Sequence, residues 1–339
     1  MPRLAMIAML AAAPTTLVAG CLAGPYPVSW QAVLGILAGG RDYDPVWVTV
    51  VVQMRLYRVI LAWLVGAGLA MSGVAFQGVL RNPLAEPFTL GVSGGAAFGA
   101  AVALGLGWNL GWAGMAFFPG LSVIPLCALA GSLLALAAAL TLSRRSGGAT
   151  RETLVLAGIV VSAFLSACIS LFKALNEEST ASIVFWIMGG FQGRGAADVW
   201  LYLPYFGLGT LVVWRYSREL DVLALGEAQA VQLGVDAARV RVRLLAAASI
   251  MAGAAVSVCG VIGFVGLAVP HLARMAFGAS SRGLLAASGL LGGTLLVWSD
   301  IVARTILPGG AELPVGVVTA LLGGPFFLFL LRRRPGGGS

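Results

Sequence analysis

Long apolar runs separated by short polar stretches make up most of the chain. A helix needs about 20 residues to cross a bilayer. We place nine runs of suitable length and one shorter run after a glycine-rich break, at 4–23, 56–80, 89–107, 114–142, 153–172, 197–214, 240–259, 284–303 and 312–331, with the short one at 261–270. The pattern predicts an all-α membrane protein of about ten transmembrane helices, formed by a single polytopic transmembrane domain over residues 1–339.

The positions of the basic residues indicate how these helices are oriented. Cytoplasmic loops collect Lys and Arg. Ten spans with both termini inside place 15 of the 21 basic residues in cytoplasmic loops, including Arg332, Arg333 and Arg334 at the end of the chain. This arrangement predicts cytoplasmic N and C termini. Arg55, Arg58 and Arg304 lie on the outer side and break the rule, so they need an explanation.

Composition supports a location in the membrane. The chain is 59% hydrophobic and 10% charged, whereas soluble domains carry about 25% charged residues. The net charge of +8 is spread over short loops rather than gathered in one patch, so no nucleic-acid partner is expected. We predict a multi-pass protein of the cytoplasmic (inner) membrane, in contact with lipid.

The N-terminus has a second interpretation. Val18 to Cys21 follow an apolar stretch with Arg3 in front and resemble a lipoprotein cleavage box. Cleavage there would remove the first span and would suit a lipoprotein-like structural protein. Pro14 interrupts the apolar run, and the rest of the chain is also apolar. Whether this segment is processed is left open.

A polar island at 223–235, LALGEAQAVQLGV, stands between two spans on the predicted cytoplasmic side. Its spacing predicts a short amphipathic helix of about a dozen residues. Such a helix between spans can bind a soluble partner. We expect Glu227 and the neighbouring apolar residues to make that contact.

Two outer segments are too short to span the bilayer. The first, at about 24–46, contains VSWQAVLGILAG with apolar residues at helical spacing, which predicts a helix on the membrane surface. The second, at 174–196, contains SIVFWIMGGFQG, which predicts a re-entrant or pore-lining half helix.

Enzyme motifs give no credible active site. Residues 91–95 fit the G-x-S-x-G pattern, but that pattern needs a preceding strand and a histidine partner, and His271 is the only histidine. We interpret it as a glycine-rich helix start. The only lysine is Lys173, so no P-loop is present. The chain is therefore predicted to be no enzyme and to bind no cofactor or metal, and ATP and Mg would belong to a partner.

Three groups of residues resemble those of a known family. The corners RNPLAEP (81–87) and PHLAR (270–274) and the segment ELPVG (312–316) are similar to signature blocks of the FecCD-type permeases of ABC importers, and the resemblance runs from about residue 40 to the C-terminus. It implies the type II ABC importer permease fold. It also implies a homodimer or pseudodimer, two cytoplasmic ATPase subunits, and a periplasmic or surface-anchored substrate-binding protein.

The resemblance also implies roles for particular residues. Arg55, Arg58 and Arg304 match outer arginines that pair with acidic residues of the binding protein, although Arg304 follows Asp300 by four residues and could instead form an internal ion pair. Asn82 and Leu84 match the inner gate, with a purely structural loop as the alternative. The island 223–235 matches the coupling helices that contact the ATPase, with Leu225, Gly226, Glu227, Ala230, Leu233 and Gly234 as the expected contact residues.

Taken together, the sequence predicts the permease subunit of an ATP-driven importer that works by alternating access at a dimer interface. The expected substrate is an iron chelate, either a siderophore complex or haem, with cobalamin as the alternative. Phe185, Trp186 and Phe191 could face a haem or corrin, but they could equally pack at an interface or in a core. A secondary transporter driven by an ion gradient is the alternative of another class. It should carry ionisable groups at mid-membrane, whereas Asp300 and Glu312 lie at the outer ends of spans.

Overall fold

The protein is a bundle of α-helices, seen here in a computed structural model that describes residues 2–40, 42–108, 123–146, 150–278 and 280–333. Six helical segments are long and apolar enough to cross a membrane: Pro45–Leu80, which includes α4 (Tyr57–Leu80), α6 (Val123–Arg145), α7 (Arg151–Leu175), α9 (Ala196–Arg215), α12 (Ala237–Cys259) and α14 (Ser281–Thr305). Further apolar helices are α1 (Pro2–Leu22), α5 (Val92–Gly105), α13 (Val265–Phe277) and α15 (Val315–Arg333). The prediction of an all-α membrane protein is confirmed. Each predicted run overlaps one of these helices, although α13 continues past the run at 261–270 and the start of the run at 114–142 lies outside the described residues.

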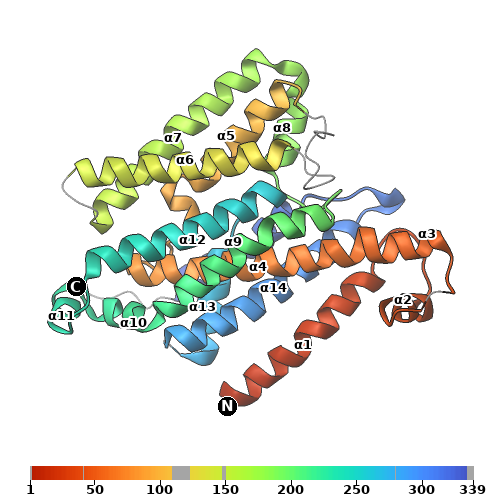
Figure 1. The fold of residues 1–339 in the computed structure, drawn as a ribbon, viewed down its shortest axis with the longest axis horizontal. Coiled ribbons are helices and arrows are strands. Elements are labelled where there is room, and N and C mark those ends of the chain that lie inside the picture. Colours follow the sequence, from red (N-terminus) through yellow and green to blue (C-terminus); the bar gives the residue numbers. More distant parts are fainter. Residues whose placement is uncertain (1, 41, 109–122, 147–149, 279, 334–339) are drawn as a thin grey trace.

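Helix α4 lies at the centre of the bundle (Figure 1). It packs against α14, α12, α13 and α9, whereas α5, α6 and α7 form a group beside α12. The most apolar stretch of the segment ending in α4 is 83% buried, and that of α7 is 22% buried. The central helix is therefore enclosed by protein, and α7 presents most of its apolar surface outward.

Glycine allows the closest helix pairs to form. A Cβ atom at Gly66 of α4 would collide with the carbonyl of Gly292 of α14, and the reverse is also true. In the same way, a Cβ atom at Gly95 of α5 would collide with the carbonyl of Gly131 of α6, and a Cβ atom at Gly131 would collide with the carbonyl of Gly95. Small residues let helix backbones approach in lipid, where packing replaces the hydrophobic drive for association.

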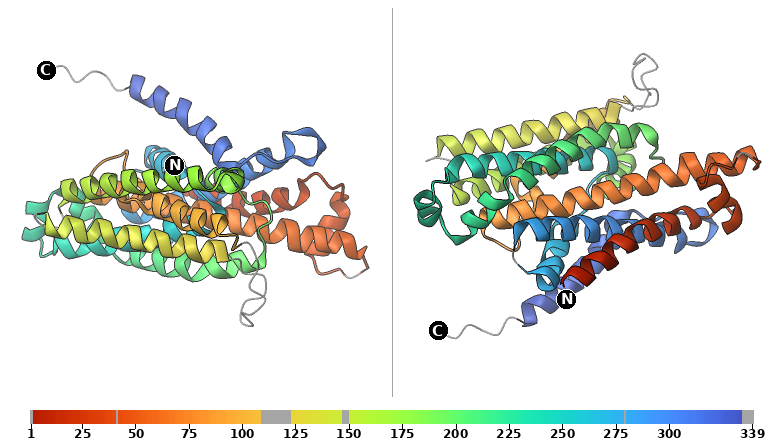
Figure 2. Two further views of the ribbon diagram at one scale, coloured as in Figure 1. Left: turned by 90° about the horizontal axis from the view of Figure 1, so that it is seen from above. Right: turned by 60° about the horizontal axis from the view of Figure 1, so that its bottom comes forward.

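The two ends of the bundle carry different short elements. Helices α2 (Trp30–Leu37) and α3 (Pro45–Val48) lie at one end, and α10 (Ser217–Leu225) and α11 (Glu227–Gln232) lie at the other (Figure 1). The start of α1 and the end of α15 both point toward the end with α10 and α11 (Figure 2). This agrees with termini on the same side as the predicted cytoplasmic island.

Both predicted outer helices are present. Helix α2 begins after Ser29, whose side chain accepts a hydrogen bond from the Ala32 N–H at 3.4 Å. Helix α8 (Thr180–Ile187) has eight residues, so it extends only about 12 Å at 1.5 Å per residue. It is too short to cross the membrane, as expected.

The apolar run at 89–107 forms a shorter helix than predicted. A 3-10 turn, η2 (Pro87–Leu90), comes first, and Gly91 then takes a left-handed conformation with φ 80°. Helix α5 therefore begins only at Val92. The G-x-S-x-G match lies at this helix start, with no strand before it among residues 42–90, and the interpretation as a glycine-rich helix start is confirmed.

Candidate functional site

Three arginines predicted on the outer side converge at the end of the bundle that carries α2 and α3, and each has partners within the chain. Arg55 belongs to the π-helical segment η1 (Thr49–Leu56) and donates to the backbone carbonyls of Cys21, Leu22 and Tyr26. These bonds tie the end of α1 to the start of α4. Arg55 was expected to face outward, yet only 4% of its surface is exposed, because carbonyls of the last two residues of α1 and of Tyr26 beyond it accept hydrogen bonds from its guanidinium.

Arg58 joins three segments that are distant in the sequence. Its guanidinium donates to Asp300 of α14, with Nη2 to Oδ1 at 2.7 Å, and to Glu312 in the loop before α15, with Nη2 to Oε2 at 2.8 Å. Both pairs use two guanidinium nitrogens, and this bidentate geometry is the strong form of the interaction. Arg58 thereby holds α4, α14 and the α15 loop together.

Asp300 also pairs with Arg304, one turn later on α14. The Arg304 Nε lies 3.3 Å from Oδ2 of Asp300, and Nη2 donates to the Gly20 carbonyl at 2.7 Å. The internal ion pair expected as one alternative for Arg304 is therefore present. Asp300 is completely buried, and its charge is balanced by two guanidinium groups.

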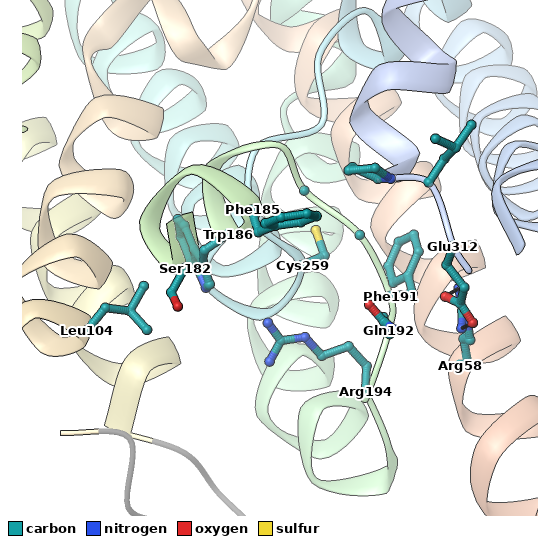
Figure 3. Close-up of a pocket in the computed structure, with 14 residues that line it drawn as sticks. Arg58, Leu104, Ser182, Phe185, Trp186, Phe191, Gln192, Arg194, Cys259 and Glu312 are labelled. Carbon is teal, nitrogen blue, oxygen red and sulfur yellow. Dashed lines mark hydrogen bonds and ion pairs between the residues drawn. The ribbon is translucent and has the colours of Figure 1, made fainter. Parts of the chain in front are cut away.

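The same three arginines line one open cavity. It has a volume of about 610 Å³ and is also bordered by Gln192, Arg194 and Glu312. A smaller cavity of about 250 Å³ adjoins it and shares Arg58, Arg194 and Glu312 (Figure 3). Figure 3 shows Arg194 extending from the loop before α9 across the smaller cavity, away from the Arg58–Glu312 pair. The structure therefore brings the predicted arginines together around a solvent-connected cavity with a surplus of positive charge.

Phe185, Trp186 and Phe191 also meet at this end. All three border the smaller cavity together with Cys259 (Figure 3). Phe191 is nevertheless fully buried in the core, whereas 65% of Phe185 is exposed. Only Phe185 is thus clearly free to touch a bound molecule.

The predicted coupling segment lies at the opposite end, and its shape differs from the prediction. Residues 223–235 do not form one helix: α10 ends at Leu225, and α11 begins at Glu227. Gly226 between them has φ 138° and ψ 158°, a conformation that favours glycine and that interrupts the helix. The expectation of a continuous helix was wrong because the apolar spacing continues across a residue that breaks the backbone.

The apolar residues of this segment divide into two groups. Leu225, Val231 and Leu233 are each more than 60% exposed. Ala230 of α11, by contrast, is completely buried and faces the core. Ala230 was expected at the contact surface, and its burial places it on the inner face instead. Gly234 has φ 78° and lies just after the end of α11. The two leucines and the valine therefore leave apolar side chains exposed at this end of the molecule.

Glu227 is held by positive charge from two other helices. It forms an ion pair with Arg241 of α12 and lies 3.9 Å from Arg151 at the start of α7. Half of the Glu227 side chain is nevertheless exposed. Arg151 and Arg241 were not predicted for this site, because partners brought together by the fold leave no local signal in the sequence.

The inner corner between α4 and α5 contains the predicted gate residues. The Asn82 side chain accepts a hydrogen bond from the Leu84 N–H at 2.9 Å and so closes a tight turn, and the Leu84 side chain is 48% exposed. Leu84 is therefore free to face a pathway, and Asn82 shapes the turn that presents it. Glu86 follows in the same corner, and burial raises the pKa of its carboxyl to about 7.

An arginine of this corner reaches the coupling segment. Arg81 has φ 51° and donates to the carbonyls of Leu223 and Ala224, at 3.1 and 2.7 Å. Helix α10 is attached to α14 at two positions. At its start, the Ser217 hydroxyl accepts a hydrogen bond from Arg282 at 3.2 Å, and at its middle, Asp221 accepts one from the Ser281 N–H at 2.9 Å. Sequence reasoning identified neither connection.

Comparisons with known proteins show which family the chain resembles. A family model described as the FecCD transport family matches residues 10–333. An uncharacterized ABC transporter permease protein of Bacillus subtilis, YvrB, is 43% identical over 93% of this chain and 87% of its own length. The cobalamin import system permease protein BtuC of Halobacterium salinarum is 42% identical over 84% of this chain and 74% of its own length.

A solved structure also matches nearly the whole chain. It is described as an inward-facing conformation of a metal-chelate type ABC transporter, and it aligns with a TM-score of 0.84 at 32% identity. The alignment covers 98% of this chain and 100% of the other.

Proposed function

Because the chain belongs to the FecCD transport family of ABC importer permeases, we propose that two copies of it form a pathway that carries a bulky metal chelate inward by alternating access. The observation that carries the proposal is that one chain holds an arginine-lined cavity at its outer end and an exposed apolar coupling segment at its inner end. An importer driven by a cytoplasmic ATPase needs one surface that binds the substrate-binding protein and another that binds the ATPase.

The outer surface receives the substrate-binding protein. Arg55, Arg58 and Arg304 border the same cavity, and the Glu312 side chain next to Arg58 is 13% exposed. A carboxylate of the binding protein reaches Arg58 by replacing Glu312, which leaves the buried pair with Asp300 intact. Contacts of this kind set the orientation and rate of docking more than its final affinity.

The inner surface receives the ATPase. Leu225, Val231 and Leu233 provide an apolar contact, and Glu227 provides a charge whose position is fixed by Arg241. The sequence has no P-loop, so ATP and Mg bind the partner subunit and this chain converts the closure of the ATPase into helix movement. The Leu84 side chains at the inner corners then close or open the pathway.

The substrate is a metal chelate. An iron chelate was predicted from the sequence, and cobalamin is the second candidate, favoured by the relative whose name includes cobalamin import. Both are too bulky for a path inside one ten-helix subunit, which supports a path between two copies.

Reconstitution tests this function. The chain is co-purified with its ATPase, placed in proteoliposomes with the binding protein, and assayed for uptake of cyanocobalamin, a ferric hydroxamate and haem. We expect one of the three to accumulate only when ATP is present on the ATPase side. Accumulation driven by an ion gradient without the ATPase would overturn the proposal. Uptake of cyanocobalamin alone would assign the second candidate in place of iron.

A further inference from the structure

A single arginine connects the coupling segment to the gate corner. Arg81 is the first residue after α4, directly before Asn82. Its backbone takes a left-handed conformation, with φ 51° and ψ 34°. Among the residues described, Phe264 is the only other non-glycine residue with a positive φ. That conformation is unfavourable for a residue that carries a Cβ atom, so glycine would form this turn more easily than arginine does.

The guanidinium lies over the last turn of α10. It donates to the carbonyls of Leu223 and Ala224, which belong to the last four residues of that helix. These carbonyls have no partner within their own helix, and a cation there also interacts favourably with the helix dipole. A Cβ at Gly226 would lie 3.1 Å from Nη2 of Arg81. The arginine thus rests directly against the break between α10 and α11.

The contact bridges two parts of the molecule with different roles. On one side is the segment with exposed Leu225 and Leu233. On the other side, one peptide bond after Arg81, is Asn82, whose side chain holds the turn that presents Leu84. The opposite end of α10 is attached to α14 through the Ser217 hydroxyl, which accepts a hydrogen bond from Arg282. Helix α10 is therefore fixed at both ends, and Arg81 supplies the attachment nearest the gate.

We propose that Arg81 is the positioning residue through which displacement of the coupling segment moves the inner gate corner. When the ATPase shifts α10 and α11, the two carbonyls pull the guanidinium, and the turn at Asn82 follows because it is the next residue. This inference rests on the proposed function, since it assumes an ATPase on the coupling segment.

The first test uses the chain alone in detergent. Arg81→Asn removes the guanidinium, and Asn tolerates the left-handed backbone better than most residues do. Arg215→Asn is the matched control, because Arg215 also contacts α10 from the cytoplasmic end but does so through a side-chain pair with Glu219 and is 73% exposed. Hydrogen exchange of the amides in 221–234 should accelerate on the order of tenfold in Arg81→Asn and stay unchanged in Arg215→Asn. Equal exchange in the two variants would overturn the proposed attachment.

The second test uses the complete transporter. A spin label at Leu84→Cys, with the four native cysteines replaced by alanine, reports the distance between the two inner corners in the nucleotide-free and the ATP-vanadate-trapped complex. With Arg81 present the distance should change between these states, and with Arg81→Asn it should change by less than half as much while vanadate still traps nucleotide. If the distance does not change with Arg81 present, the proposed function fails. If it changes equally in Arg81→Asn, the proposed function stands and the role of Arg81 is refuted.

Discussion

The outer arginines are held by a fully buried carboxylate. Asp300 has no exposed surface and lies between Arg58 and Arg304, so one negative charge compensates two positive charges inside the protein. Glu312 supplies the remaining charge from a more exposed position. Burying a charge is tolerated only when it is paired, and removing one partner leaves the others uncompensated. The two carboxylates therefore have different roles, because Asp300 maintains the structure whereas Glu312 can exchange partners.

We expect Asp300→Asn to lower the free energy of unfolding by about 3–5 kcal/mol, because two buried guanidinium groups would share Glu312 alone. Glu312→Gln should cost less, since 13% of the Glu312 side chain reaches solvent and Arg58 keeps its pair with Asp300. Thermal unfolding of both variants in detergent measures the difference. Equal losses would contradict the different roles of the two carboxylates.

Glu86 predicts a dependence of stability on pH. Burial raises the pKa of its carboxyl from 4.5 to about 7, so between these values the folded protein binds a proton that the unfolded chain releases. The stability linked to this group is therefore complete below about pH 4.5 and is lost as the pH rises to about 7.

Glu86→Gln cannot titrate and should remove that loss. We expect the variant to unfold at a higher temperature than the natural chain at pH 8, and the difference to shrink at pH 5. Glu178→Gln on the exposed outer loop is the control and should change neither value. A stabilisation by Glu86→Gln that is the same at both pH values would contradict the burial of an ionised carboxylate.

Individual elements follow the apolar pattern where the spans are regular. The runs at 56–80, 240–259 and 284–303 agree with α4, α12 and α14 to within three residues at each end. Periodicity failed where one residue controls the backbone: Gly226 divides the coupling segment, and Gly91 delays the start of α5. An apolar spacing records which side chains face the core, but it does not record a backbone angle.

The candidate sites show the same division between local and distant information. The pair of Asp300 and Arg304 could be predicted because the residues are four apart on one helix. The bonds from Arg58 to Asp300 and from Arg81 to Leu223 span 242 and 142 residues. Only the fold brings such partners together, so Arg58 could be identified from the sequence without its partners, and Arg81 could not be assigned a role at all.

The coupling segment gives a prediction at the scale of one element. Leu233→Asp places a charge on an exposed position and should leave the fold intact. It should reduce binding of the ATPase by at least about tenfold, since the contact would bury a charge without a partner. Ala230→Asp places the same charge in the buried core beneath α11 and should destabilise the chain itself. Co-purification with the ATPase and thermal unfolding distinguish the two effects. Normal ATPase binding by Leu233→Asp would show that this surface is not the contact.

At the scale of the whole molecule, the long helix α15 packs against little of its own chain. It projects away from the bundle (Figure 2) and packs mainly against α13 and α14. Leu321 and Leu322 on this helix are 69% and 56% exposed. A helix that stands off the bundle with an apolar face would gain packing from a second copy, and the pathway of the proposed importer would then lie where the two copies meet.

Cross-linking tests this assembly. In a chain whose native cysteines are replaced by alanine, Leu321→Cys or Leu322→Cys should form a disulfide between two copies in lipid nanodiscs, because residues near a symmetry axis approach their own equivalents. Leu134→Cys is the matched control. Leu134 is 71% exposed, but its helix α6 lies on the side of the bundle away from α15. The side chain at this position should face lipid, so the variant should run as a monomer on a non-reducing gel. A cross-link at Leu134 with none at Leu321 or Leu322 would place the second copy on the opposite face. The substrate pathway would then run beside α6 rather than beside α15.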